Sequence, residues 1–424
     1  MKHLANYISE KLTEAANVFG TPLHVYDERA IVSNAQRLSQ AFAWCDGFRE
    51  YFAVKATPNP FIMRILAEQG FGMDCSSLAE LELSKRCGIS GDAIMFTSNN
   101  TPLSEYKEAK ALGALINLDD ITHLEYLHNG LGLPEVLSFR LNPGDLLGGS
   151  EIIGYPKQAK FGLTREQLFQ AYRHAQELGV KHFGLHTMPI SNELDGRYFT
   201  QTVAMLLDVV CEVRRELNLE IEFINIGGGI GIPYRPEESP VCIEEISAGI
   251  RQIYGQKLSG EGVNPPRLFM ECGRYITGPY GYLVAKAIHQ KETFRSYIGV
   301  DATMADLMRP GMYGAYHHIS VLRDGQVVSE SNASKQYDIV GSLCENNDKF
   351  AVERLLPDIE IGDTLVIHDT GAHGYSMGFN YNGKLRAAEV LLRNDGTLLQ
   401  IRRREKLDDY FATLAFDELE DFRP

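Results

Sequence analysis

The chain has 424 residues, and its 41 Lys and Arg against 56 Asp and Glu give a net charge of −15 with His neutral. Hydrophobic residues make up 44% and charged residues 23%, which excludes global disorder. The negative charge argues against nucleic acid as the main partner, because phosphate backbones bind basic surfaces. The sequence contains no apolar run of about 18 residues, so we expect no transmembrane helix and no membrane partner.

Seven cysteines are dispersed along the chain, and none forms a CxxC pair. This pattern is typical of a reducing cytoplasm rather than of a disulfide framework. An HExxH motif is also absent, so the sequence predicts no metal site. The first residues, MKHLANYISEKL, lack the apolar stretch of a secretory signal. We therefore expect a cytoplasmic protein.

Short apolar runs alternate with amphipathic segments between about residues 50 and 273. The runs are YFAVKA (51–56), FGMDCSS (71–77), AIMFTSN (93–99), ALINLDD (114–120), VLSFRLNP (136–143), HFGLHTM (182–188), IEFINIGG (221–228) and RLFMECG (267–273). Between them, Ser77 with Glu80 and Thr164 with Gln167 have the spacing of capping boxes at helix starts. Eight strands alternating with helices predict an α/β protein with a TIM-like (β/α)8 barrel, and a doubly wound sheet is the alternative.

The pattern changes after about residue 283. Strand-like runs then follow one another closely: SYIGVDA, HISVL, YDIVGSL, DTLVIHD, AAEVLL and TLLQIRRR. Asp324-Gly325 and Asn394-Asp395-Gly396 separate some of these runs and are typical turn sequences. We therefore predict a barrel over residues 25–283 and a C-terminal mostly-β domain over residues 284–424, which also takes in the N-terminal segment 1–24.

Two barrel runs end in residues that could bind a cofactor. Lys55 ends the first predicted strand, where apolar surroundings would lower its pKa and make it a Schiff-base amine. The alternative is a Lys whose stem packs on apolar surface at a strand end. Gly227, Gly228 and Gly229 follow the seventh predicted strand and either bind an anion through backbone N–H groups or form only a flexible loop. Their spacing does not match a dinucleotide-binding motif.

Three further positions extend this set. Glu271 follows the eighth predicted strand and either pairs with a protonated ring nitrogen or forms a strand-end salt bridge. His186 ends the sixth predicted strand, as a core residue or as a flat ring that stacks on a cofactor. Cys344 is either a small buried hydrophobe or, beside Glu345, a proton donor. An amine, a glycine-rich loop and an acid at three strand ends match the requirements of pyridoxal 5′-phosphate.

The order of these pieces resembles the fold-type III pyridoxal-phosphate decarboxylases over most of the chain. The stretches that carry the resemblance are Thr21–Asp27, Tyr51–Ala56, Asn225–Gly231, Glu271–Arg274, Arg309–Tyr313, Leu343–Glu345 and Asp369–Gly374. The resemblance implies an alanine racemase-like fold, with the barrel followed by the β domain. It also implies a homodimer with shared active sites, in which Cys344 and Glu345 enter the site of the other chain.

The resemblance implies a role for each matching residue. Catalysis is expected of Lys55, His186 and Cys344. Cofactor binding is expected of Lys55, Asp74, His186, Gly227, Gly228, Gly229, Glu271, Cys272, Gly273, Arg274, His373 and Tyr375. Substrate binding is expected of Arg274, Arg309, Tyr313 and Glu345.

The implied reaction converts meso-2,6-diaminopimelate to L-lysine and CO₂, the last step of bacterial lysine synthesis. The far end of this amino acid carries an amine for Glu345 and a carboxylate that Arg274 and Arg309 could bind through two hydrogen bonds each. Decarboxylases of carboxynorspermidine, ornithine, lysine or arginine are the alternative. The motif Arg309-x-x-x-Tyr313 weighs against the simple basic amino acids.

Two other classes of protein are also alternatives. A catalytically inactive regulator would have no use for both Lys55 and Cys344, which this chain retains. An amino-acid racemase of this fold generally has Arg rather than Glu against the ring nitrogen, because it must avoid a full electron sink. Glu271 therefore argues against a racemase.

The chain departs from the family pattern at two points. The family usually has His-Ile-Gly-Ser after the sixth strand, whereas this chain has His186-Thr-Met-Pro-Ile-Ser191. The phosphate-binding Ser is therefore missing at its usual offset, and Ser191 or Asn192 is a candidate substitute. The family also usually has Gly-Ala-Tyr where this chain has Gly-Ala-His373, and Tyr375 could supply the hydroxyl instead.

Overall fold

The computed structural model describes residues 4–147 and 155–419. The chain divides into two compact units by its internal contacts. We call Ala30–Pro233 with Glu238–Pro279 the barrel unit, and Met1–Arg29 with Tyr234–Glu237 and Tyr280–Pro424 the sheet unit.

The predicted domain limits differ from this division by a few residues. Residue 25 lies within β1 (Leu23–Asp27), and residues 283 and 284 lie within β10 (Gly281–Glu292). Both strands belong to one sheet, in which they pair with each other, so a division inside either strand would cut that sheet. The predicted ranges also include residues 1–3, 148–154 and 420–424, which lie outside the described residues.

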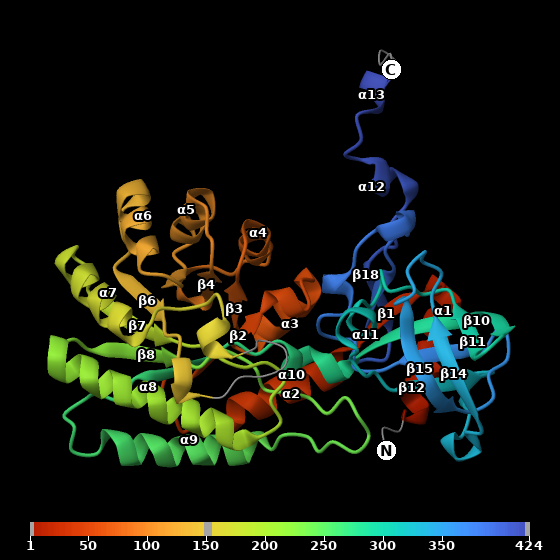
Figure 1. The fold of residues 1–424 in the computed structure, drawn as a ribbon, viewed down its shortest axis with the longest axis horizontal. Helices are drawn as coiled ribbons and strands as arrows, with labels where there is room; N and C mark the ends of the chain where they lie inside the picture. The colour runs from red at the N-terminus through yellow and green to blue at the C-terminus, as the bar shows by residue number, and fades with distance from the viewer. Residues whose placement is uncertain (1–3, 148–154, 420–424) are drawn as a thin grey trace. The chain divides into compact units, whose positions relative to one another are not determined.

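The described residues of the barrel unit form a closed barrel of eight strands, each parallel to its neighbours (Figure 1). The strands are β2 (Arg49–Ala53), β3 (Gly72–Cys75), β4 (Ile94–Ser98), β5 (Leu115–Leu118), β6 (Val136–Arg140), β7 (His182–His186), β8 (Ile221–Asn225) and β9 (Arg267–Met270). Pairing of β9 with β2 closes the barrel and excludes the doubly wound sheet. The eight predicted runs are confirmed. They read as continuous apolar segments because such strands are buried on both faces.

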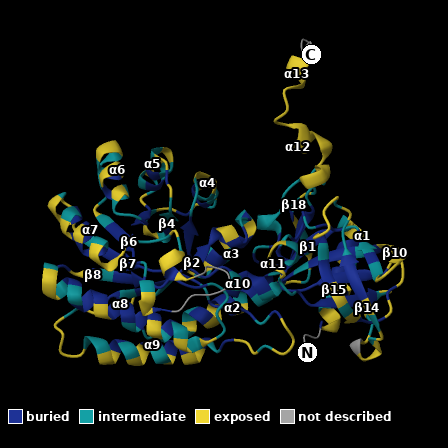
Figure 2. Cartoon of the chain, in the orientation of Figure 1, coloured by how far each residue is buried: buried dark blue, intermediate teal, exposed yellow. Residues whose placement is uncertain are grey.

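Helices cover the outside of this barrel. They are α2 (Glu28–Ala41), α3 (Pro60–Glu68), α4 (Leu78–Arg86), α5 (Leu103–Ala111), α6 (Thr122–Leu131), α7 (Arg165–Glu177), α8 (Gly196–Leu217) and α9 (Ile243–Leu258), with α10 (Arg274–Thr277) after β9. Figure 2 shows buried and exposed residues alternating around these helices, as expected for a single outer layer. The predicted capping box of Thr164 with Gln167 has both of its hydrogen bonds. The second predicted box is incomplete, because Glu80 accepts a hydrogen bond from the N–H of Ser76 rather than from that of Ser77.

Aromatic and apolar side chains fill the barrel interior. The cluster consists of Tyr51, Met95, Leu115, Phe223 and Phe269. The rings of Phe223 and Phe269 stack with centroids 4.7 Å apart. The barrel is therefore a packed core and not a pore. In barrels of this type, the chemistry takes place at the carboxyl ends of the strands.

The described residues of the sheet unit contain a ten-stranded, mostly antiparallel sheet. Its strands are β1, β10, β11 (Ser296–Val300), β12 (Ile319–Arg323), β13 (Gln326–Val327), β14 (Lys335–Val340), β15 (Lys349–Leu356), β16 (Thr364–Ile367), β17 (Ala388–Leu392) and β18 (Leu398–Arg402). The predicted β domain is therefore confirmed. Asp324 and Gly325 form the predicted turn between β12 and β13, with φ of 51° and 79°.

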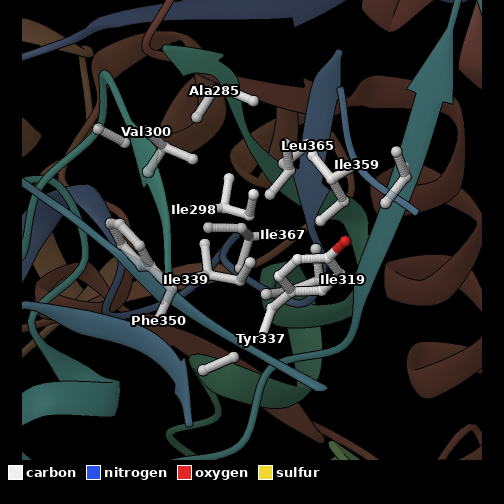
Figure 3. Close-up of a cluster of buried hydrophobic side chains, with 14 of the residues drawn as sticks. Ala285, Ile298, Val300, Ile319, Tyr337, Ile339, Phe350, Ile359, Leu365 and Ile367 are labelled. Carbon is white, nitrogen blue, oxygen red and sulfur yellow. The ribbon is translucent and has the colours of Figure 1, made fainter. Parts of the chain in front are cut away.

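This sheet unit has hydrophobic cores of its own. Figure 3 shows one of them, with Ile298, Ile339, Phe350, Leu365 and Ile367 pointing together from neighbouring strands. The unit's helices are α1 (Asn6–Phe19), α11 (Arg309–Tyr313), α12 (Leu407–Phe411) and α13 (Phe416–Leu419). Among residues 4–147 and 155–419, no helix has both the length and the apolar character needed to cross a membrane.

Candidate active site

Lys55 lies just past the end of β2, in a short 3-10 turn over Val54–Ala56. Its Nζ is 3.4 Å from Oδ2 of Asp74 on β3. The Asp74 side chain is only 2% exposed, whereas that of Lys55 is 55% exposed. One buried carboxyl group therefore restrains an amine that a ligand can still reach.

The electrostatic surroundings of Lys55 differ from the expectation. The charge of Asp74 raises the pKa of Lys55, and Glu271 and Glu80 add to this effect, so together they outweigh burial. The prediction of a lowered pKa is wrong, because carboxyl groups rather than apolar side chains face the amine. Burial and the charge of Glu271 in turn raise the pKa of Asp74, and Lys55 opposes that rise. Lys55 must therefore lose a proton before it can attack a carbonyl group.

Glu271 directly follows β9 and is held by two side chains from the neighbouring strands. His186 Nε2 lies 3.0 Å from Glu271 Oε2, and Asn225 Nδ2 donates a hydrogen bond to Oε1 at 2.7 Å. His186 and Asn225 are register partners at the ends of β7 and β8. Burial alone would raise the pKa of Glu271, but the charge and hydrogen bond of His186, with Lys55 and Asn225, keep it below its usual value. The site thus holds a buried, ionised carboxylate.

The glycine-rich loop after β8 packs tightly against both neighbouring loops. A Cβ atom on Gly228 would lie 2.3 Å from the carbonyl oxygen of Glu271, and one on Gly227 would lie 2.7 Å from that of Thr187. Gly227 and Gly229 also have φ of 67° and 93°, which favour glycine. Close backbone approach of this kind is typical of loops that bind phosphate through N–H groups.

Two polar residues at barrel strand ends were absent from the predicted site. Arg140 ends β6, and its guanidinium donates hydrogen bonds to Asp119 Oδ1 at 3.2 Å and to the carbonyl oxygen of Met188 at 3.1 Å. Asn225 ends β8 and also accepts the Gly227 N–H at 2.9 Å. Each is the last residue of its strand but only the fifth of eight residues in its predicted run, so the sequence does not mark it as a strand end.

The residues after Glu271 have structural contacts. The backbone N–H of Cys272 donates a hydrogen bond to buried Glu50, and burial raises the pKa of the Cys272 thiol. A Cβ atom on Gly273 would lie 2.6 Å from Cβ of Ala56, next to Lys55. Arg274 is the first residue of α10 and is half-buried. Gly273 thus allows the turn after β9 to approach the turn that carries the lysine.

The other predicted residues belong to the sheet unit. Arg309 is 6% exposed, its Nη1 lies 2.9 Å from Nε2 of His317, and its guanidinium stacks 4.6 Å from the centroid of Tyr234. Tyr313 ends α11 and is 55% exposed. Arg309 is therefore a fixed, buried cation, whereas Tyr313 is at the surface of the chain.

Cys344 and Glu345 are both exposed between β14 and β15. The N–H of Cys344 donates a hydrogen bond to Asn382 Oδ1 at 2.7 Å, which fixes the backbone there. The interpretation of Cys344 as a buried hydrophobe is therefore wrong. All seven cysteines of the chain fall in its described part, and all are free.

His373 stands where the family usually has Tyr, and Tyr375 is proposed to supply the hydroxyl instead. The two side chains differ in their surroundings. His373 is half-buried with φ of 56°, a left-handed conformation that is uncommon outside glycine. The ring of Tyr375 contacts the guanidinium groups of Arg386 and Arg402, which lie 4.1 and 4.7 Å from its centroid. These cation–π contacts fix the Tyr375 ring within the sheet unit.

Comparison with known families agrees with this geometry. The model of the pyridoxal-dependent decarboxylase family, pyridoxal binding domain, matches residues 28–278, which span the whole barrel. The chain therefore belongs to the pyridoxal-dependent decarboxylases and is a decarboxylase that uses pyridoxal 5′-phosphate.

Individual relatives extend the match to nearly the full chain. Protein TabA of Pseudomonas amygdali pv. tabaci is 44% identical over 413 residues, covering 97% of this chain and 96% of that protein. The diaminopimelate decarboxylase of Methanothermobacter thermautotrophicus is 38% identical over 398 residues, covering 93% and 92%. The crystal structure of the diaminopimelate decarboxylase of M. jannaschii superposes with a TM-score of 0.86 at 33% identity, covering 97% and 94%.

The residues at the barrel strand ends fit this cofactor. They offer a reachable amine, an ionised carboxylate and a glycine loop in close backbone contact. Two buried polar atoms, Nδ1 of His186 and Oδ1 of Asp74, have no hydrogen-bond partner among the described residues. Within the same residues, no group of three or more His, Cys, Asp or Glu side chains is placed to hold a metal ion.

Proposed function

We propose that this decarboxylase acts on meso-2,6-diaminopimelate and releases L-lysine and CO₂, as the last step of bacterial lysine synthesis. The observation that carries the decarboxylation is the placement of a reachable Lys55 and an ionised Glu271 at the ends of the neighbouring strands β2 and β9. Relatives named diaminopimelate decarboxylase, matched along both units, support the substrate.

Each barrel residue has a defined task in this reaction. When bound, pyridoxal phosphate supplies an aldehyde that combines with amines and a ring that accepts the electron pair left by departing CO₂. Lys55 would supply the amine that holds the cofactor. Glu271 keeps a proton on the ring nitrogen, and His186 and Asn225 keep Glu271 ionised and in place. Gly227, Gly228 and Gly229 bind the phosphate.

We assign the replacing proton to Cys344 of a second copy of the chain. Its exposure on the turn after β14 makes the thiol available to another subunit. The proposed assembly is a homodimer with shared active sites. We place it in the cytoplasm, where its seven free cysteines would stay reduced.

Substrate choice is assigned to Arg274, Arg309, Tyr313 and Glu345. The buried guanidinium of Arg309 is held by His317 and Tyr234, so little reorganisation is needed for it to bind a distal carboxylate. Glu345 would bind the distal amine. A substrate without that carboxylate would lose the charge-assisted hydrogen bonds to Arg309, which discriminates strongly.

The experiment is a substrate panel with purified protein and added pyridoxal phosphate. We expect kcat/KM for meso-diaminopimelate to exceed that for L-lysine, L-ornithine and L-arginine by at least about 100-fold, with L-lysine as product. Sedimentation of the same preparation should give twice the chain mass of 47.4 kDa. Because TabA is 44% identical and the M. thermautotrophicus diaminopimelate decarboxylase 38%, the panel is decisive: CO₂ release without lysine from diaminopimelate would refute the assignment.

A further inference from the structure

The side chain of Met188 accepts a hydrogen bond from a backbone N–H group of the glycine-rich loop. The N–H of Gly228 points to the thioether Sδ of Met188 at 3.1 Å. The neighbouring Gly227 N–H is already used by the Asn225 side chain. A Cβ atom on Gly227 would lie 2.6 Å from the same sulfur, so the thioether lies directly against the loop. The Gly228 N–H is thus satisfied by a residue of the chain itself.

The backbone that carries Met188 is fixed at several points. Its carbonyl oxygen accepts a hydrogen bond from Arg140, whose guanidinium also pairs with Asp119. The preceding Thr187 donates its hydroxyl to the Leu141 carbonyl at 2.9 Å and its N–H to Asn225 at 2.9 Å. Glu193, further along the same loop, donates its N–H to Gly229 at 2.8 Å. Rotation of the Met188 side chain is therefore the simplest way to release the Gly228 N–H.

A thioether is a poor acceptor compared with a phosphate oxygen. Sulfur in Met accepts hydrogen bonds only weakly, whereas a bond to an ionised oxygen is roughly twice as strong as a neutral one. Met is also flexible, with three rotatable bonds, so it fills and leaves irregular spaces easily. An arriving phosphate can thus displace the sulfur from Gly228, at the cost of the contacts that Met188 loses.

We propose that Met188 is a displaceable occupant of the phosphate-binding loop and that it weakens cofactor binding by competing for the Gly228 N–H. The proposal rests on the assigned role of the glycine-rich loop in binding phosphate. It makes Met188 a residue that sets cofactor affinity.

The test measures ligand binding to the apo-protein rather than turnover. Three ligands are titrated by calorimetry: pyridoxal phosphate, inorganic phosphate and pyridoxal, which lacks the phosphate. In Met188→Ala, we expect pyridoxal phosphate and inorganic phosphate to bind about three- to tenfold more tightly, as the loss of one weak competing contact predicts. Pyridoxal should bind as in the wild type. Met188→Leu, which keeps the bulk without the acceptor, should fall between the two.

Met205→Ala on α8 is the matched control for removing a methionine side chain, and its affinities should stay at the wild-type level. Unchanged or weaker binding of pyridoxal phosphate to Met188→Ala would overturn the proposal, as would an equal gain for pyridoxal. Failure of inorganic phosphate to compete with pyridoxal phosphate in every variant would instead overturn the phosphate-binding role of the loop, and the proposal with it.

Discussion

At the scale of single residues, the amine of Lys55 is controlled by carboxyl groups. Asp74, Glu271 and Glu80 raise its pKa, so the apo-protein holds the amine protonated around neutral pH. Only the neutral amine attacks an aldehyde. Cofactor attachment should therefore become faster as the pH rises toward the pKa of Lys55.

Replacing Asp74 with Asn removes the largest cause of that raised pKa. The pKa of Lys55 then falls, more of the amine is neutral at pH 7 to 8, and the profile of attachment rate against pH moves to lower pH. The measurement is the rate at which the absorption band of attached cofactor appears in apo-protein between pH 6.5 and 10. Asp119→Asn, which disturbs Arg140 instead of Lys55, is the control and should keep the wild-type profile. A profile unmoved in Asp74→Asn would contradict the electrostatic account.

Much of this site was predictable from strand ends. Lys55, His186 and Glu271 were found because each ends or follows a predicted strand of the barrel, and the structure places them together. Arg140 and Met188 were missed, because contacts between strand-end loops depend on strand register and loop packing. The raised pKa of Lys55 was missed for the same reason, since Asp74 and Glu271 are distant in sequence from the lysine.

At the scale of elements, the barrel strands were easier to identify than the sheet strands. Parallel strands buried on both faces give continuous apolar runs, and all eight were found. The missed strands lack that pattern: the last four residues of β10 read His-Gln-Lys-Glu, β13 has only two residues, and β15 has Glu353 and Arg354 within it. β1 is apolar but lies far from its partners in sequence, with β17 beginning at Ala388. Pairing over such separations has no local signal.

Strand β1 carries a buried His24 whose surroundings suit only its neutral form. Its side chain is fully buried, neither ring nitrogen has a hydrogen-bond partner among the described residues, and its ring packs edge-on against Tyr375. Burial and the charge of Arg386 lower the pKa of His24 to about 3. The unfolded chain has a His pKa of about 6.5, so it binds the proton first as pH falls.

The stabilising effect of the neutral ring is therefore complete above about pH 6.5 and is lost progressively between there and pH 3. Between pH 7.5 and 5.0, the wild type should lose roughly 2 kcal/mol more free energy of unfolding than His24→Phe, which cannot titrate. Urea denaturation at both pH values measures the difference. Equal losses in the two proteins would show that His24 does not titrate between folded and unfolded states.

At the scale of the whole molecule, the net charge of −15 is compatible with a substrate that carries two carboxylates. Only three cations are assigned to cofactor and substrate binding, and these are Lys55, Arg274 and Arg309. The structure fixes Lys55 beside Asp74, and Arg309 beside His317. Both units match full-length relatives, so the assigned residues of the sheet unit belong to the same enzyme as those of the barrel.

The central claim is that Lys55 is the amine that holds pyridoxal phosphate for decarboxylation. The most direct measurement is borohydride reduction of the holoenzyme, followed by proteolysis and mass spectrometry to locate the lysine that carries the pyridoxyl group. We predict a single modification at Lys55, together with loss of CO₂ release, and no modification in Lys55→Ala. A pyridoxyl group on another lysine of the active wild-type enzyme, or CO₂ release by Lys55→Ala at the wild-type rate, would contradict the account.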